Sequence, residues 1–244
     1  MKLVIDVGNS FVKSAVFDGS KMIEVNKTAV FSVQDVNQLL GKYQRIDSAI
    51  LSSVRKDSNK LELFLAQKFR FVLLDSETPL PFKNLYATPE TLGNDRVAAV
   101  AGAQSLFSGR DVLVIDAGTS ITYDLLTAKG EYRGGGISPG LQMRFDALHT
   151  LTSKLPLIKA EREKEIILIG NSTKTAILSG VQNGVLQEVD GIIECYKADF
   201  PGIKTLICGG DNKYFDKYLK NNIFAAPNLV LQGLMKILQF NENV

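Results

Sequence analysis

An octamer that occurs twice constrains the fold of this chain more strongly than any other feature. The copies are LVIDVGNS at Leu3–Ser10 and LVIDAGTS at Leu113–Ser120, and they are identical at six of eight positions. Each copy has the pattern of a buried strand that ends in an Asp-x-Gly turn, and each precedes further strands and then helices. A repeat at the same point of two similar series of elements predicts a duplicated domain.

We therefore predict an α/β protein of two tandem lobes, residues 1–108 and 109–244, each a mixed sheet flanked by helices. Each sheet combines an antiparallel meander with parallel strands. In the first lobe we expect the order βββαβαβ, with a helix over Asp57–Lys68, a loop at Glu77–Pro89 and a helix from Asn94 to Phe107. In the second lobe the meander leads to a helix from Pro139 to about Leu151, a strand at Ile166–Ile169, a helix from about Thr173 to Phe200, a strand at Lys204–Cys208 and two terminal helices.

Composition excludes several classes of function. The 244 residues include 28 basic and 26 acidic side chains, a balance that argues against a nucleic-acid partner. No apolar run approaches the roughly 18 residues of a membrane span, and the start MKLVIDVGNS lacks the pattern of a signal peptide. Two cysteines without a CxxC motif and a single histidine argue against zinc and are typical of a cytoplasmic protein.

The turn after the first strand is suited to hold a phosphate. Asp6 ends a buried strand, where an ionised carboxylate needs a cationic partner such as hydrated Mg²⁺. Gly8 allows the backbone to approach a phosphate closely, and Asn9, Ser10 and Lys13 add donors. A single copy would be equally consistent with an ordinary turn. The second copy, Asp116–Ser120, favours phosphate binding, with the two turns clamping a polyphosphate.

Paired Asp-x-Gly turns on two ribonuclease-H-like lobes resemble the actin, sugar-kinase and chaperone-ATPase superfamily. The Gly-Gly turn at Cys208–Asp211 matches a third superfamily element, which touches adenosine, although such a turn alone is weak evidence. Between the repeats, Asp95 and Arg96 lie where a loop becomes a helix. Asp95 suits a base for an acceptor hydroxyl and Arg96 suits an anion, but a first-turn acid favoured by the helix dipole explains Asp95 equally well.

Five motifs in order over nearly the whole chain resemble the type III pantothenate kinases. They are DVGNS, GNDR, DAGTS, GGGISPGLQMRFDAL and IGNSTKTAILSGV. The family usually has Thr where this chain has Ser10, Ala where it has Asn94, and Asn in the slot that Ser172 fills. The first change keeps a hydroxyl. Asn94 either alters the pocket or faces solvent. The change at Ser172 makes the role of the neighbouring Thr173 the least secure of those that the resemblance implies.

The resemblance implies phosphorylation of pantothenate to 4′-phosphopantothenate by ATP, the first step of coenzyme A biosynthesis, in a homodimer with its substrate site near the interface. It implies Asp95 as the base, Asp116 as the site of a monovalent cation (K⁺ or NH₄⁺), and Asp6 as a Mg²⁺ site through water. The implied ATP-binding residues are Asp6, Val7, Gly8, Asn9, Ser10, Phe11, Val12, Lys13 and Thr119. The implied pantothenate-binding residues are Tyr86, Gly93, Asn94, Asp95, Arg96 and Thr173.

Two other functions remain open at this point. One is a kinase of the same superfamily that acts on another small hydroxylated or carboxylate substrate. The other is a non-catalytic ATP-binding protein that assists transcription, since the family has also been described in that role. Neither reading predicts a membrane partner.

Overall fold

The computed structural model describes residues 1–55 and 59–243. The chain divides into two compact units. The first comprises Met1–Ser108, Gly130–Tyr132 and Asn228–Val244, and the second comprises Gly109–Lys129 and Arg133–Pro227. Within the described residues, no helix combines the length and the apolar character needed to cross a membrane.

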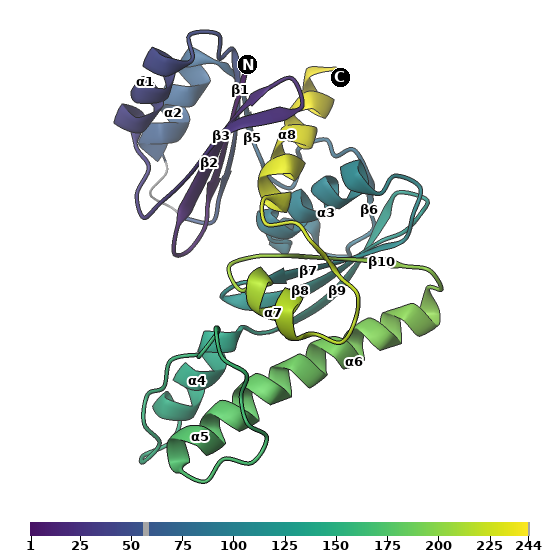
Figure 1. Ribbon diagram of the computed structural model, residues 1–244. Coiled ribbons are helices and arrows are strands. Elements are labelled where there is room, and N and C mark those ends of the chain that lie inside the picture. Colours follow the sequence, from purple (N-terminus) through teal and green to yellow (C-terminus); the bar gives the residue numbers. More distant parts are fainter. Residues whose placement is uncertain (56–58, 244) are drawn as a thin grey trace. The chain divides into compact units, whose positions relative to one another are not determined.

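The first unit contains a five-stranded sheet in the order β3-β2-β1-β4-β5 (Figure 1). Its strands are β1 (Lys2–Val7), β2 (Val12–Asp18), β3 (Lys21–Thr28), β4 (Ser48–Ser53) and β5 (Arg70–Leu73). β1, β2 and β3 form an antiparallel meander, whereas β4 runs parallel to β1 and β5 runs parallel to β4. The predicted combination of a meander with parallel strands is therefore confirmed.

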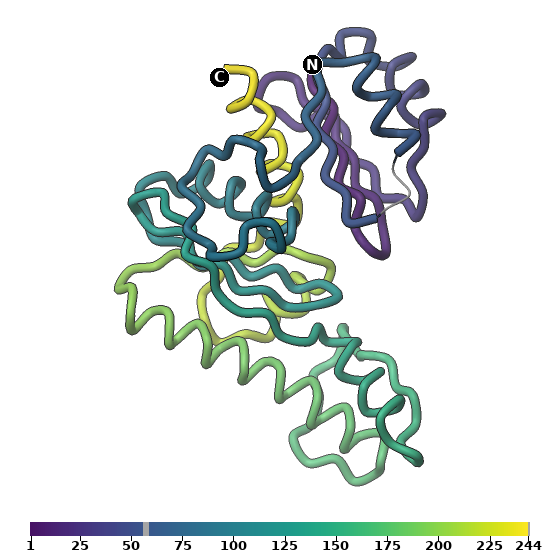
Figure 2. Tube along the Cα trace, turned by 180° about the vertical axis from the view of Figure 1, so that it is seen from behind, coloured from purple at the N-terminus to yellow at the C-terminus, as the bar shows by residue number. Residues whose placement is uncertain are grey.

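Helices cover both faces of this sheet. α1 (Val33–Lys42) and α2 (Asn59–Lys68) share a core with Leu3 and Ile5 of β1. α8 (Leu229–Glu242) contacts β1 and β4 and lies on the other face, as the reverse view also shows (Figure 2). The predicted start of the second helix at Asp57 lies outside the described residues.

The closest helix packing of the first unit joins α8 to α3 (Asn94–Leu106). A Cβ atom on Gly233 would lie 1.7 Å from the Ala98 carbonyl oxygen, and one on Gly102 would lie 2.5 Å from the Leu229 carbonyl oxygen. Only glycine permits such approaches between backbones. This packing fixes α3, whose first turn carries Asp95 and Arg96.

A short strand interrupts the segment that we predicted as a loop over Glu77–Pro89. β6 (Lys83–Asn84) pairs in parallel with the start of β9, and a 3₁₀ turn follows at Pro89–Thr91. Such a pairing joins residues far apart in sequence, so no local periodicity announces it.

The second sheet repeats the first in its topology. Its order is β11-β10-β7-β8-β9-β6, and the part β9-β8-β7-β10-β11 matches β3-β2-β1-β4-β5 strand for strand. The strands are β7 (Val112–Ala117), β8 (Ser120–Leu126), β9 (Glu131–Pro139), β10 (Lys204–Cys208) and β11 (Phe224–Ala225). β6 and the first two residues of β9 belong to the first unit. The octamer repeat thus reflects a duplicated sheet.

The helices of the second unit are α4 (Leu141–Thr150), α5 (Thr173–Leu178), α6 (Gly184–Asp199) and α7 (Asn212–Tyr218). α5 and α6 are continuous through a π-helical segment at Ser179–Asn183, so the predicted long helix is present. Leu141, Phe145, Val185 and Val189 pack into one core with β7 and β8.

Two expectations for this unit are wrong. Ile166–Ile169 forms no strand, and Ile167, Leu168 and Ile169 are exposed by 58%, 78% and 83%. Within the described residues the apolar run pairs with no strand of either sheet. Pro139 ends β9 and does not start α4, since Gly140 is the N-cap.

Candidate active site

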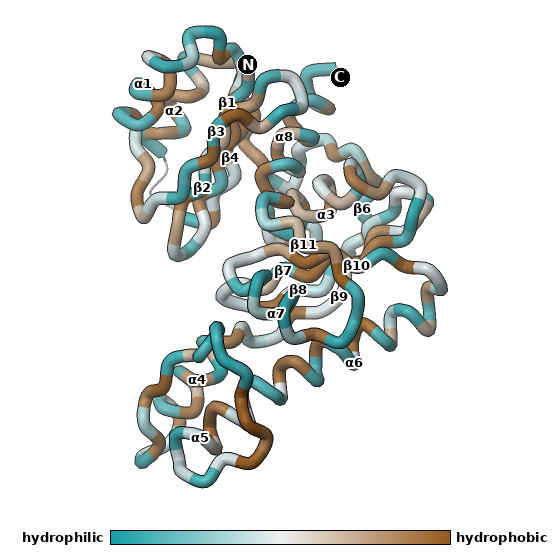
Figure 3. The backbone as a smooth tube through the Cα atoms, viewed as in Figure 1, coloured by the Kyte–Doolittle hydropathy of each residue, from teal (hydrophilic) through white to brown (hydrophobic). Residues whose placement is uncertain are grey.

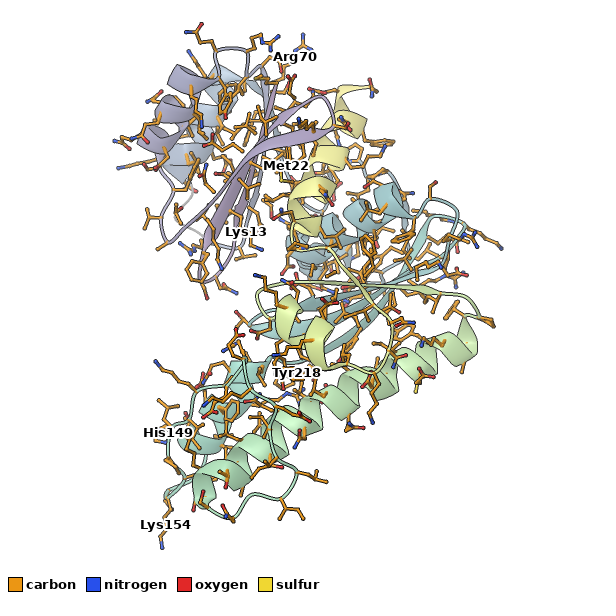
Figure 4. All side chains as sticks on the ribbon, viewed as in Figure 1. Lys13, Met22, Arg70, His149, Lys154 and Tyr218 are labelled. Carbon is orange, nitrogen blue, oxygen red and sulfur yellow. The ribbon has the colours of Figure 1, made fainter. Side chains whose placement is uncertain are left out.

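Asp6 is the last residue but one of β1 and lies on the sheet face opposite Leu3 and Ile5, because side chains alternate along a strand. It lies directly across from Lys13 on β2 and from Ser52 on β4. The Ser52 hydroxyl donates to Asp6 Oδ1 at 3.2 Å. Figure 4 labels Lys13 on β2. A carboxylate, an ammonium group and a hydroxyl from three adjacent strands therefore meet at the carboxyl end of β1.

Burial raises the pKa of Asp6 from its ordinary value of 3.8 to about 6. The charge of Lys13 and the Ser52 hydrogen bond act in the opposite direction, whereas the nearby charge of Asp95 raises the pKa further. The electrostatic effect also shows that the two carboxylates, which are far apart in sequence, lie in one region of the first unit. Asp6 is thus an incompletely neutralised carboxylate, suited to a cation.

The turn Gly8–Phe11 links β1 to β2. The Gly8 amide donates to the Phe11 carbonyl at 3.1 Å, and a Cβ atom on Gly8 would lie 3.2 Å from that oxygen. Asn9 and Ser10 at the tip are exposed. The Lys27 ammonium lies 4.2 Å from the centre of the Phe11 ring. The tip therefore presents its polar groups to solvent, as a turn that receives a ligand must.

The start of α3 shapes the environment of Asp95. Gly93 is the N-cap, and the Arg96 amide donates to Asp95 Oδ1 at 2.9 Å. The carboxylate is thus folded back over the first turn, and a Cβ atom on Gly93 would lie 2.5 Å from the same oxygen. Asp95 remains exposed, so its carboxylate is accessible to a substrate hydroxyl.

Tyr86, Arg96 and Tyr132 form a stack beside α3. The Arg96 guanidinium carbon lies 5.5 Å from the centre of the Tyr86 ring, within range of a cation–π interaction. Tyr86 stacks on Tyr132 with 6.0 Å between ring centres and 20° between planes. Arg96 is only 6% exposed. The structure thus brings together the tyrosine and the arginine that we predicted to contact the substrate.

Asn94 acts in the architecture of the same turn. Its amide nitrogen donates to the Leu74 carbonyl at 2.8 Å, which ties the start of α3 to the residue after β5. The sequence left open whether Asn94 alters a pocket or faces solvent. The hydrogen bond gives this departure from the family pattern a positioning role.

In the second unit, two glycines enclose the turn at Asp116–Ser120. A Cβ atom on Gly140 would lie 2.2 Å from the Thr119 carbonyl oxygen, and one on Gly209 would lie 2.4 Å from Asp116 Oδ1. The Asp211 amide donates to the Ala117 carbonyl at 2.9 Å. The Gly-Gly turn that we compared with the adenosine element therefore packs directly on the second Asp-x-Gly turn.

Thr173 is the first residue of α5 and is exposed. α5 lies beside α4 at the end of α6 that is remote from β10 (Figure 1). Ser172 caps the helix, accepting from the Thr175 amide at 3.3 Å. The hydroxyl of Ser172 is therefore engaged in the cap.

Sequence reasoning missed several residues of the candidate site. They are Ser52 at Asp6, Arg55 at the Gly8–Phe11 turn, and Tyr132 under Tyr86. Ser52 had a usable signal, because parallel neighbouring strands end at the same edge of a sheet. Arg55 had none, since its contacts with the turn join residues more than forty positions apart. Tyr132 had none, since its contact depends on the pairing of β6 with β9.

Fold and site together define a class of protein. Two sheets that share one five-strand order are the fold of several solved sugar kinases. A glucokinase of the ROK family from Streptomyces griseus, solved with glucose and AMPPNP, superposes with a TM-score of 0.52 at 11% identity and covers 100% of this chain and 99% of that one. A protein from Campylobacter jejuni, whose description proposes a Baf family transcriptional activator, superposes with a TM-score of 0.64 at 20% identity. The match covers 99% of this chain and 100% of that one.

The chain belongs to the type III pantothenate kinase family, whose model matches residues 2–195. A type III pantothenate kinase from Christiangramia forsetii is 45% identical over 246 residues, with 99% of each chain covered. Another from Bacteroides fragilis is 45% identical over 244 residues, again with 99% of each chain covered. The predicted family and fold are confirmed.

Proposed function

We propose that this protein transfers the γ-phosphoryl group of ATP to the hydroxyl of pantothenate, giving 4′-phosphopantothenate and ADP. This is the entry step of coenzyme A biosynthesis, and its use of ATP suits a cytoplasmic enzyme. Family membership supports the substrate and the reaction. The observation that carries the proposal is the start of α3, where an exposed carboxylate adjoins a buried arginine stacked on a tyrosine.

Asp95 is the proposed base. The pantothenate hydroxyl donates a hydrogen bond to the Asp95 carboxylate, and the proton passes to that carboxylate as the hydroxyl oxygen bonds to the γ-phosphorus. The bond between the γ-phosphorus and the bridging oxygen breaks, and ADP leaves. General-base assistance of this kind contributes typically 10²–10⁴-fold. Most of the remaining acceleration comes from positioning and from neutralisation of charge.

Arg96 and Tyr86 are proposed to orient pantothenate. The guanidinium can donate two parallel hydrogen bonds to the substrate carboxylate. Stacking on Tyr86, itself backed by Tyr132, restricts the guanidinium to one plane. Gly93 and Asn94 would fix the distance between this carboxylate site and Asp95 through the start of α3. Thr173 is proposed as a further substrate contact.

The Asp6–Lys13 segment and Thr119 are proposed to bind ATP. The buried, raised-pKa carboxylate of Asp6 fits a Mg²⁺ ion held through water, since the ion would stabilise the charged form. When bound, Mg²⁺ neutralises phosphate charge. Lys13 adds a positive charge on the neighbouring strand. Asp116, packed against Gly209, is proposed to hold a monovalent cation, K⁺ or NH₄⁺.

The test is ADP release followed in matched potassium and sodium buffers, with pantothenate, several sugars and short hydroxy acids as acceptors. We expect release that depends on pantothenate and is several-fold faster in potassium. Preference for another acceptor would assign a different kinase. Absence of turnover with every acceptor would favour a non-catalytic ATP-binding role. Equal rates in both buffers would contradict the role of Asp116.

We also propose a homodimer, with no nucleic-acid or membrane partner. An apolar strip of the second unit supports self-association. Ile167, Leu168 and Ile169 are strongly exposed, and the segment is a hydrophobic stretch beside α5 (Figure 3). Exposed apolar segments of this kind mark interaction surfaces. Light scattering should give twice the monomer mass, and Leu168→Glu should shift it toward the monomer, whereas a monomeric wild type would contradict the proposal.

A further inference from the structure

Arg55 clamps the first phosphate turn from the side of β4. Its Nε donates to the Gly8 carbonyl at 2.8 Å, and a terminal nitrogen donates to the Asn9 carbonyl at 3.0 Å. One planar guanidinium therefore holds two successive carbonyls of the turn. A lysine could not reproduce this, because its ammonium is a single point of attachment.

The backbone of Arg55 is itself fixed. The Ser53 hydroxyl accepts from the Arg55 amide at 3.1 Å and donates to the Arg55 carbonyl at 3.0 Å. The Val54 amide donates to the Val7 carbonyl at 3.1 Å, which continues the pairing of β4 with β1. The guanidinium thus approaches the turn from a segment anchored to the strand that carries Asp6.

The two clamped carbonyls determine where two amides point. In a trans peptide the N–H of one residue is antiparallel to the carbonyl of the residue before it, because the unit is planar. The described residues contain no cis peptide bond. With the Gly8 and Asn9 carbonyls directed to Arg55, the Asn9 and Ser10 amides are directed away from it. Successive amides on one side of a turn make a concave site for an anion.

The Gly8 amide is engaged within the turn itself. It donates to the Phe11 carbonyl, closing the turn between β1 and β2. The two amides that the clamped carbonyls direct away from Arg55 are those of Asn9 and Ser10. Their residues are both exposed, so a phosphate can reach them.

We propose that Arg55 is a positioning residue for nucleotide phosphates. It holds the Gly8 and Asn9 carbonyls so that the Asn9 and Ser10 amides form a phosphate cradle, without itself touching the phosphate. The inference rests on the proposed function in one respect, namely that the ligand of this turn is ATP. It adds a residue that no family motif quoted above contains.

The test compares ligands that differ only in phosphate. Calorimetric titration of the full chain with adenosine, ADP and ATP, with Mg²⁺ present, measures Kd for the wild type, Arg55→Ala and Arg55→Lys. We expect Arg55→Ala to raise Kd for ADP and ATP about tenfold or more, since hydrogen bonds to charged groups are among the stronger ones. Kd for adenosine should change less than twofold. Arg55→Lys should fall between, because one of two attachments is kept.

Kinetics and a matched control complete the experiment. The KM for ATP should rise in Arg55→Ala while the KM for pantothenate stays constant. Arg45→Ala removes another arginine of the first unit, whose side chain is 78% exposed, and should leave every constant unchanged. Melting temperatures identify variants that have lost the fold, and Arg55→Lys then carries the comparison.

Three results would overturn the inference. They are unchanged ADP affinity in Arg55→Ala, an equal loss for adenosine and ADP, and a wild type that binds ADP no better than adenosine. A loss of affinity that is confined to ADP and ATP supports the role of Arg55, whether or not pantothenate stimulates ADP release. The failure of this inference is therefore distinguishable from the failure of the proposed reaction.

Discussion

Ser52 on β4 donates a hydrogen bond to Asp6 on β1 across 3.2 Å, at the carboxyl ends of two parallel strands. The hydroxyl stabilises the charged carboxylate, yet burial has the larger effect, and the pKa of Asp6 rises to about 6. A single hydrogen bond and one lysine do not replace the water that Asp6 loses. In the absence of a bound cation, the protonated form of Asp6 is therefore favoured up to about pH 6.

We expect Asp6 to make stability depend on pH. Because its pKa in the folded state exceeds the ordinary 3.8, its contribution is fully present below that value and is lost as pH rises through about 6. Asp6→Asn removes this dependence. Urea unfolding at pH 4 and pH 7.5 should show the wild type losing roughly 2 kcal/mol more than Asp6→Asn over this interval. Parallel pH profiles for the two proteins would contradict the raised pKa.

The proposed base makes a separate prediction. Asp95→Asn keeps the size of the side chain and removes its ability to take a proton, so kcat should fall by roughly 10²–10⁴. Affinity for ATP should stay near that of the wild type, because the nucleotide turn is untouched. Glu90→Gln is the matched control, since it neutralises another exposed carboxylate in the 3₁₀ turn before α3. Near-normal turnover in Asp95→Asn would exclude the role.

Gly93 allows a test that leaves the carboxylate in the chain. A methyl group there would lie 2.5 Å from Asp95 Oδ1, the end of a flexible side chain, so the carboxylate must rotate while the fold persists. We expect Gly93→Ala to lower kcat about tenfold, in the range that small misplacements produce. Gly41→Ala in α1 meets no atom within 4 Å and serves as control. Unchanged kcat in a folded Gly93→Ala would show that the position of the carboxylate is not critical.

Local pattern predicted much of this molecule. The strands at Leu3–Val7 and Val112–Asp116 were identifiable because continuous apolar runs end in the same turn, and both occupy the centre of a sheet. The capping box of α1 is an equally local feature, since it joins Ser32 to a residue three positions later: Asp35 accepts from the Ser32 amide at 2.7 Å.

Tertiary contacts determined the rest. The run Ile166–Ile169 has strand-like composition, but within the described residues it pairs with no strand of either sheet. β6 exists only because Lys83 and Asn84 pair with the start of β9. Arg55 has no motif around it, and its meaning depends on two carbonyls that lie more than forty positions earlier. Sequence periodicity carries no information on such pairs.

Arg96 should govern affinity for pantothenate. Arg96→Lys keeps the charge but loses the planar fork and most of the stacking on Tyr86, which lies 5.5 Å away. We expect the KM for pantothenate to rise about tenfold or more with the KM for ATP unchanged. Arg70→Lys, at an exposed position of β5 labelled in Figure 4, is the control. An equal rise in both KM values would indicate a general disturbance of α3.

The adjacent glycines of the Gly-Gly turn are expected to differ sharply. Gly209 has φ +90°, and a Cβ atom there would lie 2.3 Å from the Ala117 carbonyl oxygen, which is backbone and cannot move aside. Gly210 has no atom within 4 Å of its added Cβ. Gly209→Ala should therefore destabilise the protein by about 2–4 kcal/mol through backbone strain and overpacking, whereas Gly210→Ala should change stability by less than about 1 kcal/mol.

The same pair of variants separates packing from ligand contact. Because Gly209 lies against Asp116 and Ala117, its replacement should displace the second Asp-x-Gly turn and reduce activation by potassium along with stability. Gly210→Ala leaves that turn in place. Any loss of ATP affinity in the Gly210→Ala variant would therefore come from contact between the added methyl group and the nucleotide. Urea unfolding and initial rates at several potassium concentrations measure both effects. Equal stability of the two variants would show that Gly209 is not held against the turn in solution.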